Sequence, residues 1–251
     1  MSDLLVLKVS GHELDDPAFL EELCSQIAAL SRPAILVHGG GKEITAALEY
    51  YGQKTNFING LRVTPPESMA VMEMVVCGSI NKRIVALLVS KGVQAVGLSG
   101  VDLGLLGSVP YRPDGIDLGR VGEITQVNTA AFERMLALGW LPVVAPVTLG
   151  IEDKLPYNTN ADHIAQAVAS ALGASELAFV SNVPGVLVDG AVVPQLTPSQ
   201  IDVLIASGVI NGGMIPKVKA AVAALDTGVR ATRITNLQGV QNGGTRIQRE
   251  I

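Results

Sequence analysis

Two short apolar runs near the start of the sequence are each followed by glycine and then by a helical pattern, and this repeat most restricts the fold. The first run, residues 4–9, precedes Gly11, and Asp16 and Pro17 then supply an N-cap and an N1 proline for a helix. The second run, residues 34–37, precedes three glycines and another helical stretch. Consecutive strand–loop–helix units predict a parallel sheet, and therefore an α/β fold.

The same alternation continues along the chain. Further strands are predicted over residues 94–98, 141–145, 176–180 and 230–235, and further helices over 129–138, 161–172, 198–207 and 217–226, with helix starts also at Thr64-Pro65 and Ser79. The glycine- and proline-rich segment 105–127 predicts hairpins that project from the sheet. Gly173 is a natural C-cap and the best candidate boundary. We therefore expect a mainly parallel central sheet, sandwiched by helices, that continues through two lobes, 1–172 and 173–251, with ligands at the carboxyl ends of its strands.

The composition excludes several classes of protein. Of 251 residues, 48% are hydrophobic and 16% charged, which excludes a disordered chain. A net charge of −5 without a stripe of Lys and Arg argues against a nucleic-acid partner. The most apolar stretch, residues 135–151, is interrupted by glycine and prolines, and the first residues lack a basic region, so we expect neither a membrane segment nor a signal peptide and predict a cytoplasmic location.

The sequence also shows no pattern typical of a metal site or of disulfide bonds. Cys24 and Cys77 stand alone, and the three histidines, His12, His38 and His163, show no metal-ligand spacing. The sequence therefore predicts no protein-held metal site and no disulfide framework.

The segment from His38 to Gly41 is the most informative one for chemistry, because it joins a predicted strand to a predicted helix. Consecutive glycines allow backbone N–H groups to approach an anion, although a tight turn would use the same residues. Lys8 is the only charge in its apolar strand. It either lies at a strand edge with its amine in water or ends the strand at a phosphate-binding crevice.

Four more polar residues stand in or next to the first turns of predicted helices. Asn160 is a plausible N-cap, and Asp162 in the following turn is favoured by the helix dipole. Lys217 lies in the first turn of a helix, where a cation is disfavoured unless an anion is held nearby. Arg62 is in a loop before a helix, and such a residue is either solvated or clamps a carboxylate.

Nine short segments, taken in order, resemble the signature of the N-acetylglutamate kinases within the amino acid kinase family. These segments are residues 8–11, 38–41, 59–64, 81–82, 97–100, 157–162, 183–187, 212–217 and 244–247. Two positions depart from the usual pattern: Ser10 stands where a second glycine is common, and Asn182 replaces a frequent aspartate.

The resemblance implies transfer of the ATP γ-phosphoryl group to the side-chain carboxylate of N-acetylglutamate, in arginine biosynthesis. It implies Lys8 and Lys217 as catalytic residues that neutralise the moving phosphoryl group, with Asp162 holding both lysines. The backbone N–H groups of Gly11, Gly39 and Gly40 would bind the same group. By similarity, the acyl amino acid would be bound by Gly39, Gly40, Arg62, Asn158 and Asn160.

The resemblance also implies that ATP binds to the second lobe, with Mg²⁺ held mainly by the nucleotide phosphates. The implied nucleotide-binding residues are Ser181, Asn182, Val183, Pro184, Gly185, Val186, Val209, Ile210, Asn211 and Lys217. The first lobe would then bind the amino acid and form the dimer. Because only seven residues precede Lys8, where arginine-inhibited members carry an extra helix, we expect an arginine-insensitive homodimer.

Two alternatives remain open at this point. A sister kinase of lysine or arginine synthesis would phosphorylate an aminoadipyl or glutamyl group on an acidic carrier protein. Such an enzyme should carry basic residues around the mouth of its substrate site. The net charge of −5 does not favour such a basic surface. A non-catalytic module with the same fold would sense an amino acid or a nucleotide. Both lysines together with Asp162 favour an enzyme over such a module.

Overall fold

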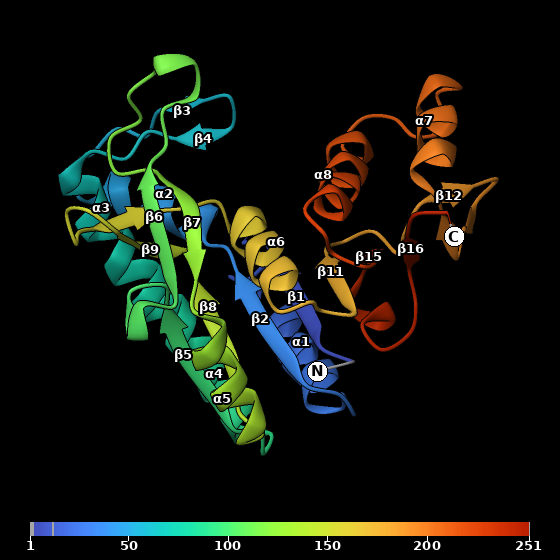
Figure 1. The fold of residues 1–251 in the computed structure, drawn as a ribbon, viewed down its shortest axis with the longest axis horizontal. Helices are drawn as coiled ribbons and strands as arrows, with labels where there is room; N and C mark the ends of the chain where they lie inside the picture. The colour runs from blue at the N-terminus through green and yellow to red at the C-terminus, as the bar shows by residue number, and fades with distance from the viewer. Residues whose placement is uncertain (1–2, 12, 251) are drawn as a thin grey trace.

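The computed structural model of the protein describes residues 3–11 and 13–250 (Figure 1). Its centre is an 8-stranded sheet with the order β14-β16-β15-β11-β1-β2-β8-β5. These strands are β1 (Leu5–Val9), β2 (Ala34–His38), β5 (Ala95–Ser99), β8 (Leu141–Ala145), β11 (Glu176–Val180), β14 (Gln195–Leu196), β15 (Thr232–Thr235) and β16 (Thr245–Ile247). Neighbours from β15 to β5 are parallel, and β16 is antiparallel to β15. The mainly parallel sheet is therefore confirmed.

The strand order reverses at β1. Its two neighbours are β2, the next strand along the chain, and β11, which follows more than half of the sequence later. A crevice outside the carboxyl ends of the strands forms at such a switch point, and ligands of open α/β sheets bind there. The sheet also continues across the candidate boundary at Gly173, which has a positive φ of 58° directly after the cap residue of a helix.

The helices lie on both faces of this sheet. They are α1 (Pro17–Ala28), α2 (Gly41–Tyr50), α3 (Pro66–Glu73), α4 (Asn81–Ser90), α5 (Thr129–Ala137), α6 (Ala161–Ala171), α7 (Pro198–Ala206) and α8 (Met214–Asp226), with a π-helical segment η1 (Met74–Ile80) and short 3₁₀ turns η2 (Asp102–Gly104), η3 (Pro113–Gly115) and η4 (Leu237–Gly239). The cap predicted at Asp16 is confirmed, since its side chain accepts from the Ala18 N–H. Thr197 caps α7 and forms a capping box with Gln200.

Two predicted helix starts are wrong. Ser79 does not begin a helix but lies inside η1, which joins α3 to α4 without an interruption. Apolar side chains such as Val76, Ile80 and Ile84 keep a buried stripe through this segment, so their packing outweighs the capping preference of a serine. Helix α8 starts at Met214 rather than Lys217.

Alternation along β1 divides the core into two layers. Leu5, Leu7 and Val9 pack on one face with side chains from α1, α2, α3, η1 and α4. Val6 packs on the opposite face with side chains from α5, α6 and α8. Because successive side chains of a strand point to opposite faces, Lys8 shares the face of Val6 and is directed toward α6.

Smaller sheets and hairpins project from this centre. A second, 4-stranded sheet has the order β10-β9-β6-β7 and includes the hairpin predicted within residues 105–127. Its strands are β6 (Leu106–Pro110), β7 (Gly122–Val127), β9 (Val147–Gly150) and β10 (Pro156–Asn158); the two-stranded hairpins are β3–β4 (Phe57–Ile58, Leu61–Arg62) and β12–β13 (Leu187–Val188, Ala191–Val192). In Figure 1 the β3–β4 hairpin stands above the strand ends, far from α7.

No helix within the described residues is both long enough and apolar enough to cross a bilayer.

A Gly11→Ala substitution should destabilise the fold, because Gly11 lies against the backbone of the next glycine loop. A Cβ at Gly11 would lie 2.3 Å from the Gly40 nitrogen and 2.8 Å from the Gly39 carbonyl carbon. We expect a loss of about 2 kcal/mol, typical of forced overpacking, measured as a lower Tm.

Gly78→Ala is the matched control. Gly78 lies within η1, and a Cβ there would meet nothing within 4 Å, so the added methyl group should leave Tm unchanged or raise it slightly. An unchanged Tm for Gly11→Ala would show that the two loops separate easily.

Candidate active site

An ion pair between β1 and α6 stands at the centre of the site. Lys8 Nζ lies 2.9 Å from Asp162 Oδ1, and 13% of the lysine side chain is exposed. Asp162 is held in the first turn of α6, where Asn160 is the N-cap and accepts a 2.8 Å hydrogen bond from the Asp162 N–H. The N-cap predicted at Asn160 is therefore confirmed, and Lys8 is a crevice residue rather than a solvated strand-edge lysine.

The predicted glycine loops lie side by side. Gly11 follows β1, and Gly39 and Gly40 follow β2, so both loops are at the carboxyl ends of adjacent parallel strands. The Gly39 N–H donates to the Val9 carbonyl oxygen over 3.1 Å, which corrects the expectation that it is free for a phosphoryl group. Within the described part of the chain, the Gly40 N–H has no acceptor.

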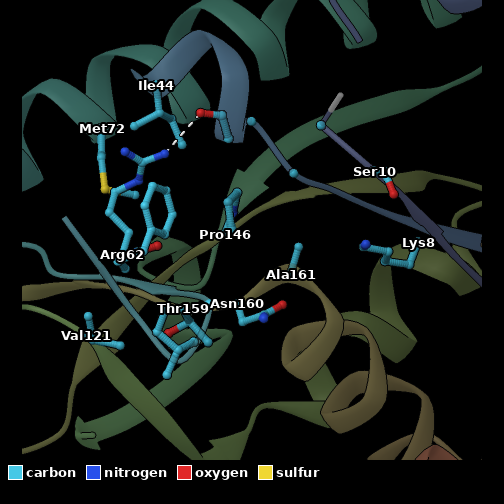
Figure 2. Close-up of a pocket in the computed structure, with 18 residues that line it drawn as sticks. Lys8, Ser10, Ile44, Arg62, Met72, Val121, Pro146, Thr159, Asn160 and Ala161 are labelled. Atoms are coloured by element: carbon cyan, nitrogen blue, oxygen red, sulfur yellow. Dashed lines mark hydrogen bonds between the residues drawn. The ribbon is translucent and has the colours of Figure 1, made fainter. Parts of the chain in front are cut away.

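These loops and the ion pair border a cavity of about 330 Å³ (Figure 2). Figure 2 shows Lys8 and Ser10 on one side of it and Arg62 on the other, with Asn160 between them. The lining includes predicted site residues from four parts of the chain, namely Lys8, Gly11, Gly39, Gly40, Arg62, Asn158 and Asn160. The structure therefore brings together the residues predicted to bind the amino acid and those predicted to bind the phosphoryl group.

Arg62 is the buried cation of this cavity. Only 7% of the residue is exposed, and its guanidinium donates to the Gly41 carbonyl and to Thr45 Oγ1, both over 3.0 Å, and to Thr55 Oγ1 over 3.1 Å. Its Cζ also lies 4.7 Å from the centre of the Phe57 ring. Burial lowers the pKa of Arg62. No ion pair among the described residues involves Arg62, so the cavity holds a buried positive charge without a protein carboxylate.

Asn158 faces the same cavity from β10. Its Nδ2 donates to Thr64 Oγ1 over 3.0 Å, and Thr64 in turn donates to the Arg62 carbonyl oxygen over 2.9 Å. Thr64 is completely buried. This hydrogen-bonded chain holds Asn158 and Arg62 in one arrangement.

A second cavity of about 220 Å³ adjoins Lys8 from the side of the second predicted lobe. Its lining includes Lys8, Asp162, Ser181 and Lys217. Lys217 lies in the first turn of α8, as predicted, and so enters the same site as Lys8. Within the described residues Asp162 forms its ion pair with Lys8 alone, so the expectation that it holds both lysines is only half met.

The other predicted nucleotide-binding residues do not line these two cavities. Val186 and Ile210 are 1% and 2% exposed and belong to the core, so a ligand could reach only their backbone. The Val186 N–H already donates to Thr245 Oγ1 over 2.8 Å. The remaining members, Asn182, Val183, Pro184, Gly185, Val209 and Asn211, lie in the loops that follow β11 and α7.

Sequence reasoning missed two residues below the glycine loop. The sequence assigns no role to the His38 side chain and places Asn81 only within the family signature, yet Asn81 Nδ2 lies 3.1 Å from His38 Nε2. Both side chains are buried. A contact between positions 43 residues apart carries no local sequence signal.

Across residues 3–11 and 13–250, no group of three or more His, Cys, Asp or Glu side chains is arranged to hold a metal ion.

The sequence matches the model of the amino acid kinase family over residues 3–236. The chain belongs to this family. It is 62% identical to an acetylglutamate kinase of Chloroflexus aggregans, over 100% of this chain and 98% of that protein. It is 51% identical to an acetylglutamate kinase of Roseiflexus castenholzii, over 96% of this chain and 92% of that protein. A solved structure from Streptococcus mutans has a TM-score of 0.80 and 30% identity, and the match covers 100% of both chains. These matches confirm the predicted amino acid kinase fold.

Stability should depend on pH through His38. Burial lowers the pKa of His38 from 6.5 to about 4, with smaller contributions from Arg83 and Lys82, while the bond to Gly39 opposes the shift. Because the folded pKa lies below the unfolded one, the unfolded chain binds the extra proton first. The stabilising contribution is complete above pH 6.5 and is lost as pH falls toward 4, by about 3 kcal/mol.

The measurement is denaturant unfolding at several pH values for the wild type and for His38→Asn, which cannot titrate. The difference between the two should change across this interval. A constant difference would show that the native state protonates His38 as easily as the unfolded chain.

Proposed function

We propose that this protein transfers the γ-phosphoryl group of ATP to the side-chain carboxylate of N-acetyl-L-glutamate, giving N-acetylglutamyl 5-phosphate for arginine biosynthesis. Relatives named acetylglutamate kinase, at 62% and 51% identity over nearly the whole chain, support this activity. The structural observation that best supports this activity concerns Arg62. It is buried, it has no carboxylate partner among the described residues, and it lines the same cavity as Lys8.

Arg62 and Asn158 would bind the amino acid. Hydrogen bonds to Gly41 and Thr45 already orient the guanidinium of Arg62. It therefore loses little further conformational entropy when it binds a carboxylate. The α-carboxylate of N-acetylglutamate would supply the negative charge that the cavity lacks. Asn158, Asn160 and the backbone of Gly39 and Gly40 would bind the rest of the substrate, with its side chain directed toward Lys8.

The reaction needs charge neutralisation more than proton transfer. A carboxylate with a pKa near 4 is already ionised at neutral pH, so it attacks without a general base. The obstacle is repulsion between this carboxylate and the triphosphate. Lys8 and Lys217 would offset this repulsion from the two cavities. The N–H of Gly40, which has no acceptor among the described residues, would bind the moving group together with the N–H of Gly11. Asp162 positions Lys8.

ATP would lie over residues 173–251, the proposed nucleotide-binding lobe, with its phosphates at Lys217 and Ser181. The loops at 181–186 and 209–211 would hold the rest of the nucleotide. Mg²⁺, carried by the phosphate oxygens, would supply additional positive charge at the reaction centre.

We further propose a cytoplasmic homodimer formed by the lobe of residues 1–172. Strand β5 is the terminal strand of the large sheet, and Val101 and Leu103 just beyond it are 38% and 69% exposed. An open strand edge beside exposed apolar side chains favours contact with a second copy. Sedimentation should give a dimer without change on addition of arginine, whereas a hexamer would contradict the proposal.

A hydroxamate assay tests the activity directly, because hydroxylamine traps acyl phosphates. With ATP, Mg²⁺ and free N-acetylglutamate, we expect hydroxamate to form. Turnover only on a carrier-linked aminoadipyl or glutamyl group would instead indicate the sister kinase. Ligand binding without any turnover would indicate a sensing module.

Arg62→Lys should weaken substrate binding selectively. Lysine keeps the charge but cannot reproduce the guanidinium fork, so KM for N-acetylglutamate should rise roughly 10- to 100-fold, as expected for one charge-assisted contact. KM for ATP should stay constant in the same steady-state assay. A parallel rise of both KM values would show that Arg62 supports the fold and does not clamp the acceptor.

Lys217→Ala should lower kcat by about 100-fold, because it removes one charge from the phosphoryl site. Lys219→Ala is the matched control: Lys219 is exposed on the same helix, outside both cavities, and its loss should leave kcat unchanged. Equal losses in the two variants would contradict a catalytic role for Lys217.

A further inference from the structure

A chain of buried polar groups lies beneath the glycine loop that follows β2. Asn81 Nδ2 lies 3.1 Å from His38 Nε2, and His38 Nδ1 lies 2.9 Å from the Gly39 carbonyl oxygen. Asn81 is 1% exposed and His38 is fully buried. The chain therefore connects helix α4 to the peptide between Gly39 and Gly40.

The partners of Asn81 fix the direction of every hydrogen bond in this chain. The Val143 carbonyl oxygen, 2.9 Å from Asn81 Nδ2, can only accept, and Lys82 Nζ, 3.1 Å from Asn81 Oδ1, can only donate. The amide nitrogen of Asn81 thus faces His38 and donates to Nε2. His38 must then carry its proton on Nδ1, from which it donates to the Gly39 carbonyl oxygen.

The bond to the Gly39 carbonyl also determines where the Gly40 N–H points. Within a planar trans peptide, the C=O of one residue and the N–H of the next point in opposite directions. Because His38 holds the Gly39 oxygen on its own side of the loop, the Gly40 N–H is directed away from His38. That N–H has no acceptor among the described residues, and Gly40 lines the 330 Å³ cavity.

The loop is restrained from two more sides. The Gly39 N–H donates to the Val9 carbonyl oxygen, so both polar groups of Gly39 are occupied. A Cβ at Gly40 would lie 2.8 Å from Ile80 Cδ1 and 2.9 Å from Val76 Cγ1, so η1 packs directly against this glycine. The same segment ends immediately before Asn81.

We propose that His38 and Asn81 are positioning residues that lock the Gly39–Gly40 peptide so that the Gly40 N–H faces the transferring phosphoryl group. This role rests on the proposed kinase function. Neither side chain touches substrate. Their contribution is preorganisation of one backbone donor, which needs no rearrangement when charge develops in the transition state.

The imidazole acts here as a neutral donor. Burial, with smaller contributions from the cationic Arg83 and Lys82, lowers the pKa of His38 to about 4 against the opposing bond to Gly39, so the ring is neutral and carries one proton at neutral pH. Asn81 decides which nitrogen holds that proton.

Two substitutions at His38 separate positioning from packing. In His38→Asn, the amide nitrogen takes the place of Nδ1 and can still donate to the Gly39 oxygen. In His38→Gln, the amide takes the place of Nε2, which keeps the contact with Asn81 but leaves the Gly39 oxygen without its donor. Glutamine also matches the volume of histidine better than asparagine does.

A positioning role and a space-filling role for His38 therefore predict opposite orders of activity for the two variants. If His38 positions the loop, His38→Gln should lose roughly 100-fold in kcat, as on removal of one oxyanion-type donor, and His38→Asn should retain most of it. KM for N-acetylglutamate should remain unchanged in both. If His38 only fills space, His38→Asn will be the less active and less stable variant, which would overturn the proposal.

Wild-type protein provides a test that does not depend on mutant folding or on turnover. Nitrogen-15 NMR of the His38 ring at neutral pH should show the proton on Nδ1, and a proton on Nε2 would overturn the proposal. If the ring is protonated on Nδ1 but the wild type forms no hydroxamate, the proposed function fails while the hydrogen-bonded chain stands. The two failures are thereby distinguished.

Discussion

The contact between the Gly11 loop and the Gly39–Gly40 loop is the constraint on which the rest of the site depends. Parallel strands β1 and β2 end at the same edge of the sheet, and their following loops approach each other closely at Gly11, Gly39 and Gly40. Only glycine permits this approach, and the backbone of both loops borders the 330 Å³ cavity. Lys8 reaches the same point from β1 because alternation along the strand turns it toward α6.

Lys8 also connects the two halves of the site. It lines the cavity that contains Arg62 and the cavity that contains Lys217, so one cation borders both of the proposed reactant positions. Phosphoryl transfer requires the acceptor anion to approach the phosphate anion in line. A positive charge between the two anions acts where their repulsion is greatest. The ion pair with Asp162 keeps this ammonium at the boundary between the cavities.

The family resemblance, and not a local pattern, predicts that Lys8, Arg62 and Lys217 belong to one site. Local sequence patterns were enough to predict six strands of the large sheet, all but β14 and β16, and the caps at Asp16 and Asn160. These features follow from periodicity, capping chemistry and the common edge where parallel strands end. The wrong helix start at Ser79 arose because a local capping preference is weaker than a continuous buried stripe. The occupied N–H of Gly39 and the pairing of His38 with Asn81 depend on tertiary contacts, which no local pattern encodes.

The continuity of the large sheet across Gly173 limits how the two halves of the chain can move. Strands β1 and β11 are joined along five residue pairs, from Leu5 with Glu176 to Val9 with Val180. A flexible linker would let one half swing open as a rigid body, but a hydrogen-bonded ladder resists that motion. Any approach of Lys217 toward Lys8 must then come from a change in sheet twist or from a shift of α8 over its strands. Substrate capture by the proposed kinase would then be an elastic deformation rather than the closing of a hinge.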